Sequence, residues 1–324
     1  MELNKTYDNL SNMRTKKLLP IAHIQQNSHI EITLNDQAEV VDARVIEKED
    51  APTIVPCTME SGGRTSSPAP HALFDSIQYI AGDLDKYSGQ YKDHTHDKYM
   101  ENLKNWATST YSHPKAEIIY RYLLKNNLIS DLIDKGILTT SNNILVESWD
   151  NTMSDKPALF KVLGASSQEK AFVRFVVNIP GEVNESGWND STLQSAYTNY
   201  YLNQSTINDL CYGTGEYMPI TFNHAKGIRR SGDGAKLISA NDASGFTFRG
   251  RFSTKEEAVS VGYITSEKAH NALKYLIRNQ GRTINEKIFL VWGTKNEVLP
   301  DIYSNSIDLL GEDGEDDDRG DVTQ

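Results

Sequence analysis

The fold is decided by His29-Ile-Glu-Ile-Thr-Leu-Asn-Asp-Gln-Ala-Glu-Val-Val-Asp-Ala-Arg-Val-Ile-Glu47, a stretch in which apolar and polar residues alternate on both sides of Asn35-Asp36. Alternation with a period of two is typical of a strand with one buried face, and an Asn-Asp pair favours a turn. We therefore expect a β-hairpin. A second run, residues 171–178, alternates less cleanly and predicts a strand that is buried on both faces.

Around this hairpin the sequence predicts several helices and a few further strands. Residues 71–82 carry apolar side chains at helical spacing. Thr265 is the expected cap of a helix that ends at Gly281, where a C-cap glycine belongs. Further helices are expected over residues 96–111, over 115–135 and from Asp190 or Ser191 to about 204, and further strands over 158–163 and 287–292. Because strands and helices do not alternate regularly, the expected fold is α+β, with a mixed or antiparallel sheet, several packed helices and long Gly/Ser/Asn-rich loops.

The charge of the chain is unevenly distributed. Its formal net charge is −11 at pH 7, which by itself argues against a nucleic-acid partner. Residues 311–321 carry seven acidic residues and one arginine, so removing their net −6 leaves −5 on the rest of the chain. Like charges repel and nothing apolar anchors them, as is typical of a disordered segment. We expect residues 1–310 to form the folded domain and residues 311–324 to be an acidic disordered tail or linker.

Familiar enzyme signatures are missing from the sequence. Cys57 and Cys211 are the only cysteines, too few on their own for a disulfide framework or a zinc site. Walker, Gly-x-Ser-x-Gly and His-Glu-x-x-His motifs are absent, and Asp93-His-Thr-His-Asp97 has no further metal ligands at a motif spacing. We therefore expect no cofactor, no metal and no catalysis, although Cys211 with downstream His224 leaves a thiol hydrolase open. No segment has the pattern of a signal peptide or a membrane span, so we expect a reduced, cytoplasmic protein.

The most basic segment covers residues 224–255. It carries seven lysines and arginines against Asp233 and Asp242, a charge of +5 within a chain of −11. Its glycines let the backbone approach a phosphate closely, and its short polar side chains suit phosphates or base edges. The alternative is a solvated loop whose phenylalanines pack inward. The candidate DNA contacts in this segment are Lys226, Arg229, Arg230, Lys236, Ser239, Asn241 and Ser244.

A second candidate site lies just ahead of residues 71–82. An arginine followed by hydroxyl side chains, close to a helix N-terminus, suits an anion. The alternative is a loop in which the hydroxyls bond to their own backbone. The candidate contacts here are Arg64, Thr65, Ser66 and Ser67.

Three groups of motifs follow one another along the chain. The first is Arg64-Thr-Ser-Ser-Pro-Ala-Pro-His-Ala-Leu-Phe-Asp75 with Tyr79-Ile-Ala-Gly82. The second is Cys211-Tyr-Gly-Thr-Gly-Glu216, His224-Ala-Lys-Gly-Ile228 and Gly234-Ala-Lys-Leu-Ile-Ser-Ala-Asn241, and the third is Ala258 to Ile277 with Phe289-Leu-Val-Trp-Gly293. In this order and spacing they resemble the large-subunit family of type I-C CRISPR surveillance complexes. His71 is also a candidate contact, although members commonly have asparagine at this position.

The resemblance implies a non-catalytic protein of which this chain is the N-terminal, DNA-facing part. Such subunits bind the duplex at the protospacer-adjacent motif, help to open the DNA and form a docking surface for a helicase-nuclease. Guide pairing then reads most of the sequence, while the protein reads a short motif and DNA shape. The implied partners are target double-stranded DNA, guide crRNA held by the assembly, the backbone and crRNA-processing subunits, and the helicase-nuclease, with no membrane. Outside this family, an acidic interaction or scaffold protein without DNA binding stays open.

Overall fold

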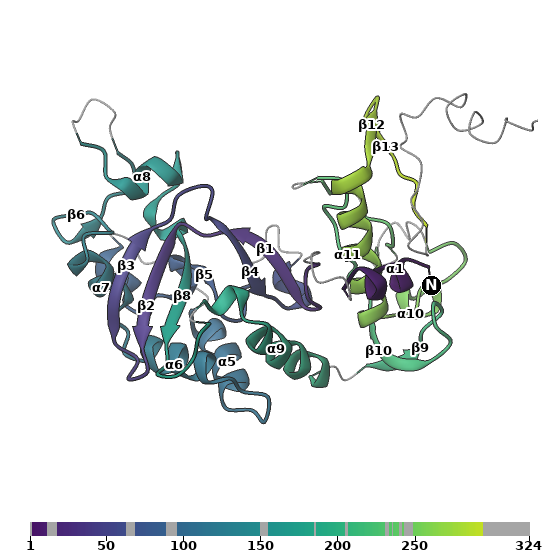
Figure 1. Cartoon of the computed structure of the whole chain (residues 1–324), viewed down its shortest axis with the longest axis horizontal. Coiled ribbons are helices and arrows are strands. Elements are labelled where there is room, and N and C mark those ends of the chain that lie inside the picture. The colour runs from purple at the N-terminus through teal and green to yellow at the C-terminus, as the bar shows by residue number, and fades with distance from the viewer. Residues whose placement is uncertain are drawn as a thin grey trace, which may run out of the picture. The chain divides into compact units, whose positions relative to one another are not determined.

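The computed structural model describes residues 2–11, 18–62, 69–88, 96–149, 155–184, 186–204, 207–230, 233–234, 236–239, 242 and 249–293 (Figure 1). The chain divides into two compact units. The larger unit consists of Leu19–Lys226 and Lys236–Glu267, and the smaller unit of Met1–Leu18, Gly227–Ala235 and Lys268–Gln324. The acidic residues 311–324 lie outside the described residues, so their expected disorder stays a prediction.

A four-stranded mixed sheet forms the centre of the larger unit, in the order β3-β2-β8-β5. The predicted hairpin is confirmed: β2 (Ile30–Asn35) pairs antiparallel with β3 (Val40–Val45). Strand β8 (Phe172–Asn178) runs parallel to β2 along its whole length and is buried on both faces, as expected. The short β5 (Asp75–Ser76) completes the sheet on the other side of β8. Mixed strand directions among many helices confirm the α+β class.

Helices cover the apolar face of this sheet. In Figure 1, α6 (Pro114–Leu123) lies behind β2 and β8, and α5 (His96–Ala107) lies next to α6, on the side of α9. The ring of Tyr122 on α6 meets Phe175 of β8 edge-on at 6.1 Å, and Trp106 on α5 meets Tyr197 at 4.9 Å. These large side chains are almost completely buried. Burial of this apolar area is the main stabilising contribution to the unit.

Two helix predictions are partly wrong, each for a local reason. Over residues 71–82 only α3 (Ile77–Ile80) is helical. The Asp75 carboxylate accepts the backbone N–H groups of His71 and Ser76, which offers this backbone an alternative to the helix. The single helix expected over 115–135 is divided into α6 and α7 (Leu128–Asp134), because Asn126 adopts a left-handed conformation with φ of 52°.

The strand expected over residues 158–163 is wrong, since α8 (Ala158–Leu163) is a helix. Its buried residues Leu159, Phe160 and Leu163 follow helical rather than alternating spacing. Helix α9 (Ser191–Asn203) begins at the predicted cap, Asp190, and ends as expected.

The remaining elements are mostly short. Helix α11 (Tyr263–Gln280) ends immediately before Gly281, as predicted, but the predicted cap is wrong, because the helix begins two residues before Thr265 and includes it. The strand expected over 287–292 is the shorter β13 (Lys287–Phe289), which pairs with β12 (Arg282–Ile284). No helix in the described ranges is long and apolar enough to cross a bilayer. The other elements are α1 (Glu2–Ser11), β1 (His23–Asn27), β4 (Pro52–Pro56), α2 (Met59–Gly62), α4 (Leu84–Tyr87), β6 (Thr140–Ser141), β7 (Ile144–Leu145), β9 (Asn208–Leu210), β10 (Tyr217–Thr221), α10 (Lys255–Ala258) and β11 (Val261–Gly262).

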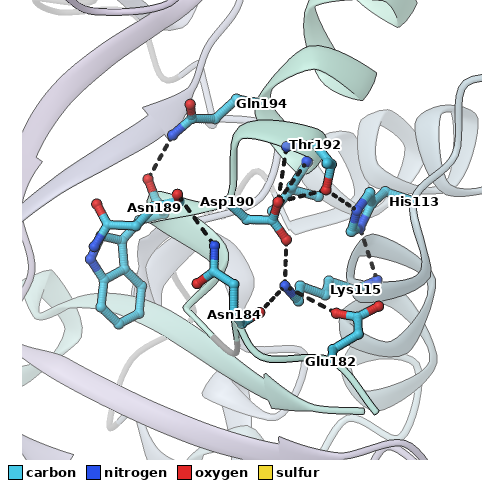
Figure 2. Close-up of polar contacts among 10 residues, drawn as sticks. His113, Lys115, Glu182, Asn184, Asn189, Asp190, Thr192 and Gln194 are labelled. Carbon is cyan, nitrogen blue, oxygen red and sulfur yellow. Dashed lines mark hydrogen bonds and ion pairs between the residues drawn. The ribbon is translucent and has the colours of Figure 1, made fainter. Parts of the chain in front are cut away.

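A buried lysine anchors the start of α9 (Figure 2). Lys115 of α6 is completely buried, and its ammonium group donates to the Asp190 carboxylate and the Asn184 carbonyl. Glu182 lies 3.3 Å from the same ammonium group. Burial alone would raise the pKa of Asp190, but hydrogen bonds from Lys115 and Thr192 outweigh it and lower that pKa. The ammonium charge of Lys115 and the carboxylate charges of Asp190 and Glu182 therefore compensate one another, and these contacts fix the start of α9.

We expect the larger unit to lose stability between about pH 6.5 and pH 4 through His23. Burial lowers the pKa of His23 to about 4 and outweighs the opposing effect of the Ile21 carbonyl, which lies 2.8 Å from Nδ1; Nε2 has no acceptor among the described residues. The unfolded chain binds a proton there near pH 6.5 and the folded chain does not, so stability falls as the pH falls through this window. The contribution is roughly 3 kcal/mol.

Denaturant titrations of wild type and His23→Gln across this pH range measure the effect. Glutamine has no proton to gain, so its stability should depend less steeply on pH. Parallel curves for the two proteins would contradict the assignment to His23.

Candidate nucleic-acid interface

Two lysines face each other at the base of the basic segment. Lys226 and Lys236, both in the larger unit, form an isolated antiparallel bridge in which each residue is the direct partner of the other. Lys236 is exposed and Lys226 is half-buried. Like charges directly opposite each other are destabilising, so a pair of this kind gains from a bound anion. This is the strongest local sign of a phosphate contact in the segment.

Only one of the two neighbouring arginines is available to a ligand. In the smaller unit, the Asp233 carboxylate accepts from Arg229 Nε at 2.8 Å and from Nη2 at 3.0 Å, a bidentate pair that satisfies this guanidinium. Both arginines are exposed, and Arg230 is the one whose guanidinium has no ion pair among the described residues.

The remaining basic residues of the segment are mostly engaged within the larger unit. Arg249 is buried and donates to the Ser253 carbonyl at 2.9 Å. Lys255 lies 4.7 Å above the Phe222 ring and 3.8 Å from a Glu256 carboxylate oxygen. Few of the seven basic residues in this segment are therefore both exposed and without an ion pair among the described residues.

Half of the sequence-predicted contacts cannot be placed. Arg64, Thr65, Ser66, Ser67, Asn241 and Ser244 lie outside the described residues. Ser239 is half-buried. His71 belongs to the core: its side chain is completely buried, with its ring 6.1 Å from that of Phe172. A direct DNA contact by His71 would require this ring to leave the core.

A pocket of about 290 Å³ lies within the larger unit. Its lining is formed by residues 58–60, residues 69–70, Lys98, Asn102, Tyr201 and Asn223. The pocket thus touches both flanks of residues 63–68, which include Arg64. Sequence reasoning missed Lys98 and Asn102, although their spacing of four residues places them on one face of α5.

Cys211 has a structural environment. The thiol is completely buried, and its sulfur accepts from the Gly262 N–H at 3.1 Å and lies 3.8 Å from the Thr265 hydroxyl. Burial raises the pKa of Cys211, but these and neighbouring donors outweigh it and lower the pKa to about 7. His224 Nδ1 lies 2.8 Å from the Ser266 hydroxyl. Backbone N–H groups and hydroxyls surround this sulfur.

Comparison with known protein families assigns nearly the whole chain to one family. A family model described as CRISPR-associated protein (Cas_Csd1) matches residues 3–323. The matched range includes all three groups of motifs that carry the sequence resemblance. Among curated proteins, none matches the chain.

Proposed function

Because this chain belongs to the Cas_Csd1 family of CRISPR-associated proteins, the large subunits of type I-C effector complexes, we propose that it recognises the protospacer-adjacent motif duplex, helps to unwind the DNA and provides a docking surface for a helicase-nuclease. On this proposal it is a cytoplasmic, non-catalytic subunit without a cofactor. Its partners are target DNA, the guide crRNA, and the backbone and crRNA-processing subunits.

The opposed pair Lys226 and Lys236 is the observation that carries the DNA-binding part of this proposal. Side chains of directly paired residues project to the same side of the backbone, so one phosphate can contact both ammonium groups. Exposed Arg230 adds a third positive group of the same segment. Since the whole chain carries −11, such contacts are local, and affinity depends on the guide RNA and partner subunits completing the binding channel.

The reconstituted complex on target duplex tests the proposal. Lys226→Ala, Arg230→Ala and Lys236→Ala should each weaken binding about equally across motif variants, because phosphate contacts carry no sequence information. Each should also flatten the dependence of log affinity on log salt by roughly one unit, as expected for one lost phosphate contact. Binding is measured by titration at two salt concentrations.

Two variants serve as controls in the same titrations. Lys161→Ala removes an exposed lysine of α8, and Cys211→Ala removes the buried thiol; both should bind like wild type. Wild-type affinity and salt slope in a variant that combines Lys226→Ala, Arg230→Ala and Lys236→Ala would overturn the placement of the DNA site. A complex that assembles but never binds duplex would favour the scaffold alternative, and loss of function only in Cys211→Ala would reopen the thiol hydrolase.

A further inference from the structure

The pocket lined by Met59, Pro70 and Asn102 combines apolar walls with polar groups that can bind the edge of a nucleobase. Met59 and Pro70 supply a thioether and a ring on which a flat group can rest. Asn102 is half-buried, and its carboxamide has no hydrogen-bond partner among the described residues. The Tyr201 hydroxyl accepts from the Met59 N–H at 2.9 Å, which leaves its own hydrogen to donate. A carboxamide with a hydroxyl donor matches the mixed donors and acceptors of a nucleobase edge.

A weak ion pair lines the same pocket. Lys98 and Glu60 both line it, and their charged groups lie 3.2 Å apart, with side-chain exposures of 50% and 69%. An exposed pair of this kind contributes little to stability, so Lys98 can exchange the carboxylate for a phosphate at small cost. Glu60 opposes a phosphate at the same place by charge repulsion. Lys98 therefore attracts an anionic ligand, and Glu60 repels it.

The volume restricts what the pocket can hold. Ligand pockets commonly enclose roughly 300–1,000 Å³, so a pocket of about 290 Å³ suits one small flat group and not a stacked pair of bases. Binding one base requires that it be unstacked, which is least costly in single-stranded or locally opened nucleic acid.

We propose that this pocket binds one unstacked nucleotide of the nucleic acid held by the complex, with the base between Met59 and Pro70, its edge at Asn102 and Tyr201, and its phosphate at Lys98. This inference rests on the proposed function, since it deepens DNA binding to a single-nucleotide site. The nucleotide comes either from the target DNA or from the guide RNA, which share this chemistry.

The opposite charges of Lys98 and Glu60 give the first test. In the reconstituted complex, Lys98→Gln should weaken target binding roughly 2- to 5-fold and reduce the salt slope by about one unit. Glu60→Gln should strengthen binding by a similar factor, because it releases Lys98 and removes a repulsive charge. If the ion pair were merely structural, both variants would lose the same contact and shift binding in the same direction, which would overturn the proposal. Lys104→Gln, an exposed lysine of the same helix outside the pocket, is the matched control.

Abasic nucleotides give the second test and identify the source of the base. An abasic site is moved one position at a time through the target DNA and, separately, through the guide RNA. One position should cost affinity in wild type, and this cost should disappear in Asn102→Ala but persist in Asn105→Ala, an exposed control on α5. A complex that binds DNA with the expected salt dependence but shows no such position in either strand would sink the pocket proposal and leave the proposed function intact. Loss of salt-dependent binding in the complex as a whole would contradict the proposed function itself.

Discussion

Lys115→Met should destabilise the larger unit by roughly 3–5 kcal/mol, the range observed when one partner of a buried ion pair is removed. Methionine fills much of the volume of the lysine side chain, so little of this loss comes from a cavity. The loss arises because the Asp190 carboxylate, whose side chain is only 7% exposed, keeps its charge without the ammonium group that compensates it. Asp190 also caps α9, which carries Tyr201 to the pocket, so the change should reach the proposed nucleotide site as well.

Urea denaturation of Lys115→Met, Lys161→Met and the double variant Lys115→Met/Asp190→Asn measures this effect. Lys161 is exposed, so its replacement should change stability by less than about 0.5 kcal/mol. Asparagine retains an oxygen to cap α9 without the charge, so the double variant should recover a large part of the loss. The penalty of the single variant should also shrink as the pH falls, because protonation removes the unpaired charge of Asp190. A single variant within about 1 kcal/mol of wild type would show that Thr192 and water already satisfy Asp190.

The parts of the fold that sequence predicts are those with a strong local period. Alternation on both sides of Asn35-Asp36 predicted the β2–β3 hairpin, because a shift of one residue would expose its apolar side chains. The parallel pairing of β8 with β2 joins residues that are more than 100 positions apart, and no local pattern encodes it. Residues 158–163 show why short apolar runs mislead: six residues are too few to separate a period of two from one of 3.6.

From the sequence, the candidate site was predictable only as an excess of basic residues in one segment. The excess of basic residues in 224–255 is visible in sequence, but which of them are neutralised depends on the folded loop that brings Asp233 to Arg229. That Lys226 lies directly opposite Lys236 follows from the backbone pairing of the folded loop, which residue propensities do not predict. Lys98 on α5 has the pattern of an ordinary solvated helix face until the pocket beside it is known.

A ladder of charges crosses three strands on the polar side of the central sheet. Glu31 of β2 is the direct partner of Arg44 on β3 and of Arg174 on β8. Arg174 donates from Nε at 2.9 Å and from Nη2 at 2.7 Å to one Glu31 oxygen, while Arg44 Nε donates to the other oxygen at 2.7 Å. The Arg174 guanidinium also lies 3.7 Å from the centroid of the Trp188 ring, a cation–π contact. This ladder specifies the register of the only parallel pairing among the described strands.

We therefore expect Arg174→Met to destabilise the larger unit by roughly 3–5 kcal/mol. The buried Glu31 carboxylate would then keep only one ion-pair partner, Arg44, which is mostly exposed. Arg174→Lys should lose a substantial part of the same stability, because an ammonium group cannot reproduce the fork that also reaches the Asp50 carbonyl at 2.7 Å or the stacking on Trp188.

Burial raises the pKa of Glu31, but the two arginines outweigh it and hold that pKa below its usual value. Its contribution is thus complete at neutral pH and is lost as the pH falls through the lowered pKa. Denaturant titrations of both variants at pH 7 and in acid test this, with Arg44→Met as the control that removes only the exposed partner and should cost much less. Equal losses in Arg44→Met and Arg174→Met would contradict the central role assigned to the buried arginine.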